Sequence, residues 1–200
     1  MTDTFASLDN QAGFTLLELL VVLAIAAILM ATAMPHFRLM MLSSARAQGS
    51  TQLVAAFNQA RSEAIEKNSN VVVCRRNYFA SSSYPTCGIS SGTWAQGWIV
   101  YRDSDGVVDA SEPDAAGDIL AVYEPIGRVT ASGDNAFNVL PSSNPAFLAF
   151  GSNGRPSQAL SFTLCDSNRQ LDKARRVDVA LSGYVSLQAL DVATTTSVCG

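Results

Sequence analysis

Histidine is nearly absent from this 200-residue sequence, which contains only His36. No Cys-x-x-Cys pair occurs, and no glycine-rich phosphate loop accompanies the plentiful serines. Structural zinc sites are built from several Cys or His ligands, and a nucleophilic serine needs a base beside it. We therefore expect no metal, no cofactor and no catalytic residue, and we do not expect an enzyme.

Basic residues are also scarce, and the formal net charge is −4. This balance gives no general attraction to nucleic acid or to anionic lipid. Residues 1–13 contain Asp3 and Asp9 but neither Lys nor Arg. A secretory signal peptide has a basic head and is cut after its apolar run, whereas here the small residue Gly13 precedes the run.

Charge is scarcest in residues 14–34, where Glu18 is the only charged side chain. The segment is long enough to cross a hydrocarbon core about 30 Å thick, so we predict a transmembrane helix there. A carboxylate in such a helix costs about 2.5 to 3.5 kcal/mol on insertion scales. Glu18 is therefore expected to have a partner or a function. The alternative is an ordinary single-span anchor with an incidental acid.

The stretch Gly-Phe-Thr-Leu-Leu-Glu, from Gly13 to Glu18, resembles the processing site of type IV prepilins and type II secretion pseudopilins. The resemblance implies that residues 1–13 are a leader, which a prepilin peptidase removes after Gly13, and that Phe14 is then N-methylated. It also implies that Glu18 neutralises the amino terminus of a neighbouring subunit. Because the leader lacks basic residues, its orientation rests on the resemblance, which implies a single pass through the inner membrane and a periplasmic domain.

Apolar residues continue at spacings of three and four beyond Pro35, as in an amphipathic helix. We expect residues 35–68 to continue the first helix, with a bend near Pro35, and residues 69–200 to form one β-rich domain. The predicted fold class is α+β and type IV pilin-like, with a long N-terminal helix packed on an antiparallel sheet. The expected strands are residues 71–75, 98–101, 119–123, 147–150, 160–165, 177–181 and 184–187.

The four cysteines all follow the predicted span, at Cys74, Cys87, Cys165 and Cys199. An even number in an exported region predicts two disulfides, for which three connectivities are possible. The spacing favours Cys74 with Cys87 and Cys165 with Cys199.

Acidic residues cluster from Asp103 to Asp118 with no Lys or Arg between them. Carboxylates on a loop can bind calcium, but the EF-hand order is absent, and a solvated turn is the simpler interpretation. The preceding segment, from Gly97 to Gly106, together with Gly154-Arg155 and Cys165-Asp166, resembles the GspH/FimT family of minor pilins and pseudopilins. This resemblance implies a structural subunit that contacts other pilins and helps initiate or tune assembly of a type IV pilus. The alternative is an H-type minor pseudopilin of a type II secretion system.

Basic residues gather late in the sequence, at Arg169, Lys173, Arg175 and Arg176. Such a group could contact DNA phosphates, so a DNA-binding minor pilin for natural transformation is a further alternative. Relatives that resemble competence pilins carry a Gly-Arg-x-Arg element after the strand corresponding to residues 177–181. Here Tyr184 and Ser186 stand in place of the two arginines. We therefore favour a solvated loop with local ion pairs over a DNA site.

Overall fold

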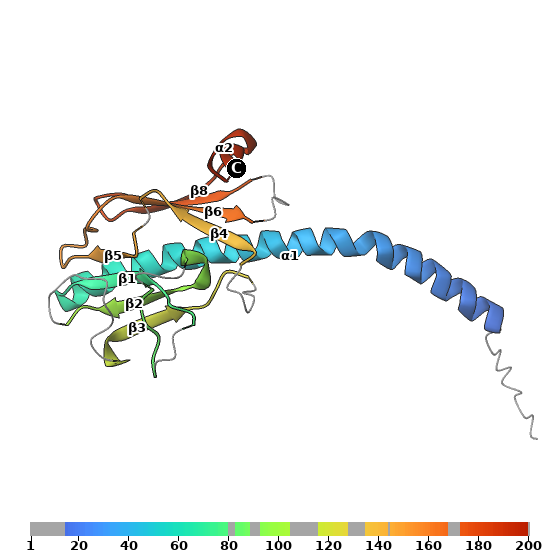
Figure 1. The fold of residues 1–200 in the computed structure, drawn as a ribbon, viewed down its shortest axis with the longest axis horizontal. Helices are drawn as coiled ribbons and strands as arrows, with labels where there is room; N and C mark the ends of the chain where they lie inside the picture. The colour runs from blue at the N-terminus through green and yellow to red at the C-terminus, as the bar shows by residue number, and fades with distance from the viewer. Residues whose placement is uncertain are drawn as a thin grey trace, which may run out of the picture. The chain divides into compact units, whose positions relative to one another are not determined.

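The computed structural model describes residues 15–79, 83–88, 93–104, 116–127, 135–143, 145–167 and 173–199. The chain divides into two units, Met1–Met40 and Met41–Gly200. Helix α1, Leu16–Lys67, begins in the first unit and ends in the second. A long N-terminal helix followed by antiparallel sheets confirms the predicted α+β class (Figure 1).

The first unit contributes the N-terminal part of α1, whose large apolar side chains are exposed; Leu16 is 76% exposed and Ile25 is 54% exposed. Among the described residues no single straight helix is both long and apolar enough to cross a membrane. Leu16–Ala31 and His36–Lys67, taken together as a bent pair, meet that criterion by length and composition. An apolar surface this extended marks a site of contact with lipid or with other proteins.

The second unit contains two four-stranded antiparallel sheets. The first has the order β3-β2-β1-β5, formed by β1 (Val71–Arg75), β2 (Trp98–Arg102), β3 (Ile119–Tyr123) and β5 (Phe147–Phe150). The second has the order β4-β6-β7-β8, formed by β4 (Phe137–Pro141), β6 (Leu160–Asp166), β7 (Arg175–Val179) and β8 (Val185–Ala189). A short helix α2, Val192–Cys199, follows β8, and 3-10 turns precede β2 and β3 at Trp94–Gln96 and Ala116–Asp118.

The seven predicted strands are all present, but in the β7–β8 hairpin β7 lies two residues earlier than expected and β8 begins one residue later. The strand predicted at residues 177–181 is Arg175–Val179, and the one predicted at 184–187 is Val185–Ala189. Ala180 already belongs to the turn, because its N–H donates to Tyr184 O at 2.9 Å and its carbonyl accepts from Gly183 N at 2.8 Å. Strand β4 and helix α2 were not predicted.

The C-terminal half of α1 packs against both sheets. The ring of Phe57 lies 6.4 Å from Phe150 of β5 and 5.1 Å from Phe162 of β6, measured between centroids. Ala56 and Ala60 on the same stripe are fully buried, and their small side chains allow the strands to approach the helix closely. Removing a buried ring such as that of Phe57 costs about 3 to 5 kcal/mol, so this half of the helix is a central part of the domain core.

Candidate functional site

Glu18 lies in the first turn of α1, and its side chain is exposed. The backbone N–H of Glu18 donates to Thr15 Oγ1 at 3.2 Å, which satisfies one of the free donors at the start of the helix. Gly13 and Phe14, the residues of the expected cleavage site, lie outside the described residues. The described part of the helix therefore presents Glu18 within a long exposed apolar segment, where a neighbouring chain can reach it.

Both disulfides join the cysteine pairs that the spacing favours. The bond between Cys74 and Cys87 attaches the segment after β1 to that strand. The bond between Cys165 and Cys199 attaches α2 to β6, and Thr195 Oγ1 of α2 also accepts from Ala174 N at 2.8 Å. The chain end is thus held on the second sheet by one covalent and one hydrogen-bonded contact.

The two acidic residues of the acidic loop that the structure describes, Asp103 and Asp118, both accept hydrogen bonds from neighbouring side chains. Asp103 accepts from Asn70 Nδ2 at 3.2 Å, and both residues are at least half-buried. Asp118 accepts from Arg102 Nη2 at 2.9 Å and from Ser104 Oγ at 3.1 Å. Residues 105–115, which carry the other acids, lie outside the described residues. Within the described ranges no group of three or more His, Cys, Asp or Glu could hold a metal ion.

Strand β7 separates the arginines that the sequence groups together. Val177 and Val179 are buried in the core, so alternation places Arg175 on the same face, toward α1. Arg176 points to the opposite face, where its Nε lies 2.9 Å from Asp178 Oδ1. Lys173 lies just before β7, and Arg169 lies outside the described residues. Arg175 and Arg176 therefore do not share one phosphate-binding surface.

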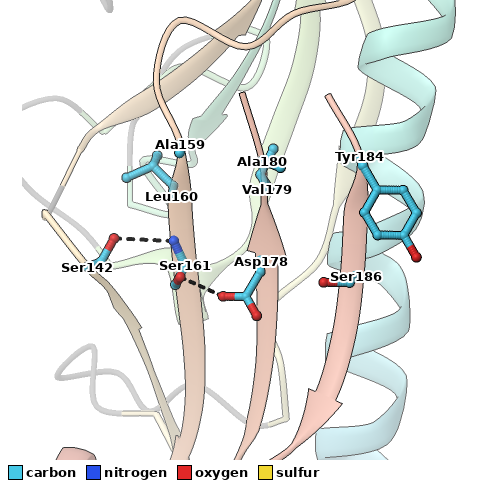
Figure 2. A pocket seen from close by; sticks show the side chains of 9 residues that line it. All are labelled: Ser142, Ala159, Leu160, Ser161, Asp178, Val179, Ala180, Tyr184 and Ser186. Carbon is cyan, nitrogen blue, oxygen red and sulfur yellow. Dashed lines mark hydrogen bonds between the residues drawn. The ribbon is translucent and has the colours of Figure 1, made fainter. Parts of the chain in front are cut away.

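The outer face of the second sheet carries a shallow hollow of about 180 Å³ (Figure 2). Ser161 of β6 forms hydrogen bonds to residues on both sides of this hollow. Its Oγ donates to Asp178 Oδ1 of β7 at 2.6 Å, and its N–H donates to Ser142 Oγ, just after β4, at 3.2 Å. Tyr184, which is 65% exposed, and Ser186 also line it. Relatives that resemble competence pilins carry arginines at these two positions, and Asp178 is the only charged residue among the described residues of the lining. Because Arg176 pairs with this carboxylate, no unpaired cation lines the described part of the hollow to attract phosphate.

The sequence analysis missed a group of charged residues where α1 enters the second unit. Arg46 is half-buried, and its Nε and Nη1 atoms are buried without a hydrogen-bond partner. Burial and the charge of Arg175 lower the pKa of Arg46, whereas Asp166 acts to raise it. Arg175 Nη1 makes a long hydrogen bond of 3.5 Å to Ser50 Oγ, and Ser50 is fully buried. The sequence feature that could have indicated this group is an arginine four residues before a serine, which places both on one face of α1 beside its apolar stripe.

Comparison with known proteins agrees with this architecture. Residues 50–183 match the family model described as type II transport protein GspH, and residues 8–34 match the prokaryotic N-terminal methylation motif. No curated protein sequence matches the chain significantly.

Solved structures of two proteins are similar to this chain. The type IV minor pilin FimU of Pseudomonas aeruginosa aligns with a TM-score of 0.51 and 17% identity, over 72% of this chain and 87% of FimU. The minor pseudopilin EpsH from the Type 2 Secretion System of Vibrio cholerae aligns with a TM-score of 0.47 and 11% identity, over 72% of this chain and 96% of EpsH. The likeness to FimU supports the pilin-like fold. Because the family model spans more than half of the sequence, the chain belongs to the GspH family of type II transport proteins and has the long helix and antiparallel sheets of a minor pilin or pseudopilin.

Proposed function

We propose that the protein is a structural subunit, a minor pilin that helps initiate or tune assembly of a type IV pilus. The observation that carries this proposal is the division of α1 into two chemically different parts. Its C-terminal half is buried in a self-contained domain, whereas its N-terminal half exposes a continuous apolar surface. Such a surface has to be covered by lipid before assembly and by the helices of other pilins afterwards.

The match to the N-terminal methylation motif supports the processing that this function requires. In the proposal, residues 1–13 are a leader that prepilin peptidase removes after Gly13, and Phe14 is then N-methylated. Residues 14–34 span the inner membrane once, residues 35–68 continue the helix, and residues 69–200 form the periplasmic domain. Glu18 then pairs with the free amino terminus of a neighbouring subunit during assembly.

Intact mass of the protein from its native membranes and from sheared filaments tests this sequence of events. We expect one mass, which corresponds to a chain that begins at a methylated Phe14. Retention of residues 1–13 in the filament fraction would overturn the proposed processing. Absence of the protein from every filament preparation would overturn the assembly role.

A second candidate is an H-type minor pseudopilin, which the type II transport description of the matching family favours. Both candidates require the same exposed helix, so they differ in the filament that contains the protein. Deletion of the gene distinguishes the two candidates. Loss of surface pili indicates a minor pilin, and loss of secreted type II substrates indicates a minor pseudopilin. A role in DNA uptake is not favoured, since Tyr184 and Ser186 replace the two arginines and the nearby Arg176 is paired with Asp178.

A further inference from the structure

A half-buried cluster with excess positive charge lies at the end of the second sheet where α1 enters the second unit. Arg46 and Ser50 lie one turn apart on the same face of α1. Arg175 of β7 donates a hydrogen bond to Ser50. Asp166, the last residue of β6, is buried, and its negative charge acts to raise the pKa of Arg46. The described residues of this cluster therefore include two guanidinium groups and one carboxylate, which leaves one positive charge in excess.

The guanidinium group of Arg46 lacks acceptors. Its Nε and Nη1 atoms are inaccessible to solvent and make no hydrogen bond. A guanidinium group cannot remove the cost of its unsatisfied donors by losing a proton, since it stays charged throughout the physiological pH range. A buried donor without an acceptor is unfavourable, and a second positive charge on Arg175 adds to the cost. In the isolated chain this arrangement therefore favours the approach of an anionic group.

The cluster adjoins the exposed apolar surface of α1. Met41, at the start of the second unit, is 56% exposed although it is apolar. The helix rises about 1.5 Å per residue, so Met41 and Arg46 are about 8 Å apart along its axis. Five residues also turn the helix by about 140°, so a protein chain that covers Met41 has to continue around α1 to reach the guanidinium groups.

We propose that Arg46 and Arg175 form a docking site for the carboxylate side chain of a neighbouring pilin-type subunit. This inference rests on the proposed assembly function and adds the chemistry by which a neighbour is selected. Both arginine side chains are partly exposed, so a carboxylate from outside can accept charge-assisted hydrogen bonds from the N–H groups that remain accessible and restores the charge balance of the cluster. A neighbour without an acid at this level leaves the excess positive charge of the cluster without a counter-charge, which disfavours its incorporation.

Photocrosslinking in cells of the native host tests the docking site on the full-length chain. Benzoylphenylalanine replaces Met41, and crosslinked subunits are recovered from sheared filaments and identified by mass spectrometry. We expect a crosslink to another pilin-type subunit, whose yield falls about ten-fold or more in Arg46→Met and in Arg175→Gln, because each removes one partner of a buried charge pair. Arg176→Gln is the matched control, since it changes the next residue of β7 on the opposite face and should leave the yield unchanged.

Thermal unfolding of the same full-length variants in detergent separates docking from a structural role. Arg46→Met replaces an unpaired buried charge with an apolar side chain of similar length, so its midpoint should equal or exceed that of the wild type. A parallel loss of folded protein and of crosslink in both cluster variants would show that the arginines act within the domain, and would overturn the docking site.

Crosslinking and incorporation of both cluster variants at the wild-type level would also overturn it. The wild-type chain distinguishes this failure from failure of the proposed function. If the wild type enters filaments and the variants do so equally, only the docking site is wrong. If the wild type itself never enters a filament, the assembly function fails, and the docking site fails with it.

Discussion

Gly49 of α1 lies so close to Ile126 that a Cβ atom added at Gly49 would be 2.7 Å from Ile126 Cδ1. Ile126 is itself 2% exposed, so its side chain has little room to move away. This contact explains why the apolar stripe of α1 contains a glycine at a position where alanine favours the helix.

We predict that Gly49→Ala lowers the free energy of unfolding by about 1 to 2 kcal/mol. Overpacking a buried site costs about 1 to 3 kcal/mol, and the gain in helix propensity of up to about 1 kcal/mol offsets only part of this. Urea unfolding followed by tryptophan fluorescence measures the change, because Trp94 and Trp98 are both buried in the core. Gly117→Ala is the control, since a Cβ at exposed Gly117 meets nothing within 4 Å. An unchanged or raised stability for Gly49→Ala would contradict the prediction.

The main elements of the fold could be predicted because their hydrophobic periods are long and regular. Strand β4 was missed because Phe137–Pro141 contains Asn138 and ends in proline, which are both unfavourable in a strand. It forms because β4 is an edge strand, where a missing N–H is tolerated.

Helix α2 was missed because Thr194, Thr195 and Thr196 are poor helix formers. One local and one tertiary contact stabilise it instead: Asp191 Oδ1 caps the helix by accepting from Thr194 N at 2.7 Å, and Cys199 is bonded to Cys165 of β6. The cluster of Arg46 and Arg175 could not be predicted, because it depends on which face of β7 each arginine takes. A shift of the strand by one residue would have placed Arg176 there instead.

The bond between Cys165 and Cys199 should contribute about 3 to 4 kcal/mol, because it closes a loop with a sequence separation of 34. We expect the double variant Cys165→Ala with Cys199→Ala to lose about this free energy of unfolding, with α2 released from β6. Urea unfolding measures the loss, and hydrogen exchange of residues 192–199 reports the release. Selective reduction of the same bond in the wild type is the control. If the double variant is as stable as the oxidised wild type, the disulfide does not contribute to the stability of the domain.

The pKa of Asp191 is lowered by the hydrogen bonds that its carboxylate accepts from the backbone and side chain of Thr194. A lowered pKa in the folded state means that the cap stabilises α2 above the unfolded pKa of about 3.9 and is lost as pH falls through the folded value. We expect the Thr194 amide proton shift to titrate with a midpoint below about 3.9. Asp191→Asn keeps the acceptor and should abolish this titration. A midpoint at or above that of free aspartate would contradict the capping role.

Glu18→Ala should insert into the membrane at least as well as the wild type but enter filaments poorly. The variant removes the cost of a carboxylate in an apolar segment. It also leaves the amino terminus of a neighbour unpaired at low dielectric, at a cost of about 3 to 5 kcal/mol. Quantitative blotting of membranes and sheared filaments gives the ratio of the two pools. Glu18→Asp is the control, because it keeps the charge. Equal ratios for Glu18→Ala and the wild type would exclude the charge pair.

DNA affinity should be weak in the wild type and should appear when the missing arginines are introduced. Tyr184 and Ser186 border a hollow in which Asp178 already pairs with Arg176, so the one cation beside the described lining is engaged by a carboxylate. At about 150 mM salt we expect the full-length chain in detergent to bind a fluorescent duplex more weakly than micromolar. Tyr184→Arg with Ser186→Arg should bind more tightly, with a salt slope steeper by about 1.8, which corresponds to two added phosphate contacts.

Val192→Arg with Val198→Arg is the matched control for this gain. It adds the same charge at half-exposed positions of α2, 50% and 44% exposed, away from the hollow. We expect little binding from this control, because two phosphate contacts outside a shaped surface are screened at this salt concentration. Fluorescence anisotropy across a salt series measures all three proteins. Micromolar or tighter binding by the wild type, abolished by Arg175→Ala with Arg176→Ala, would contradict the prediction and favour a role in DNA uptake over the structural one.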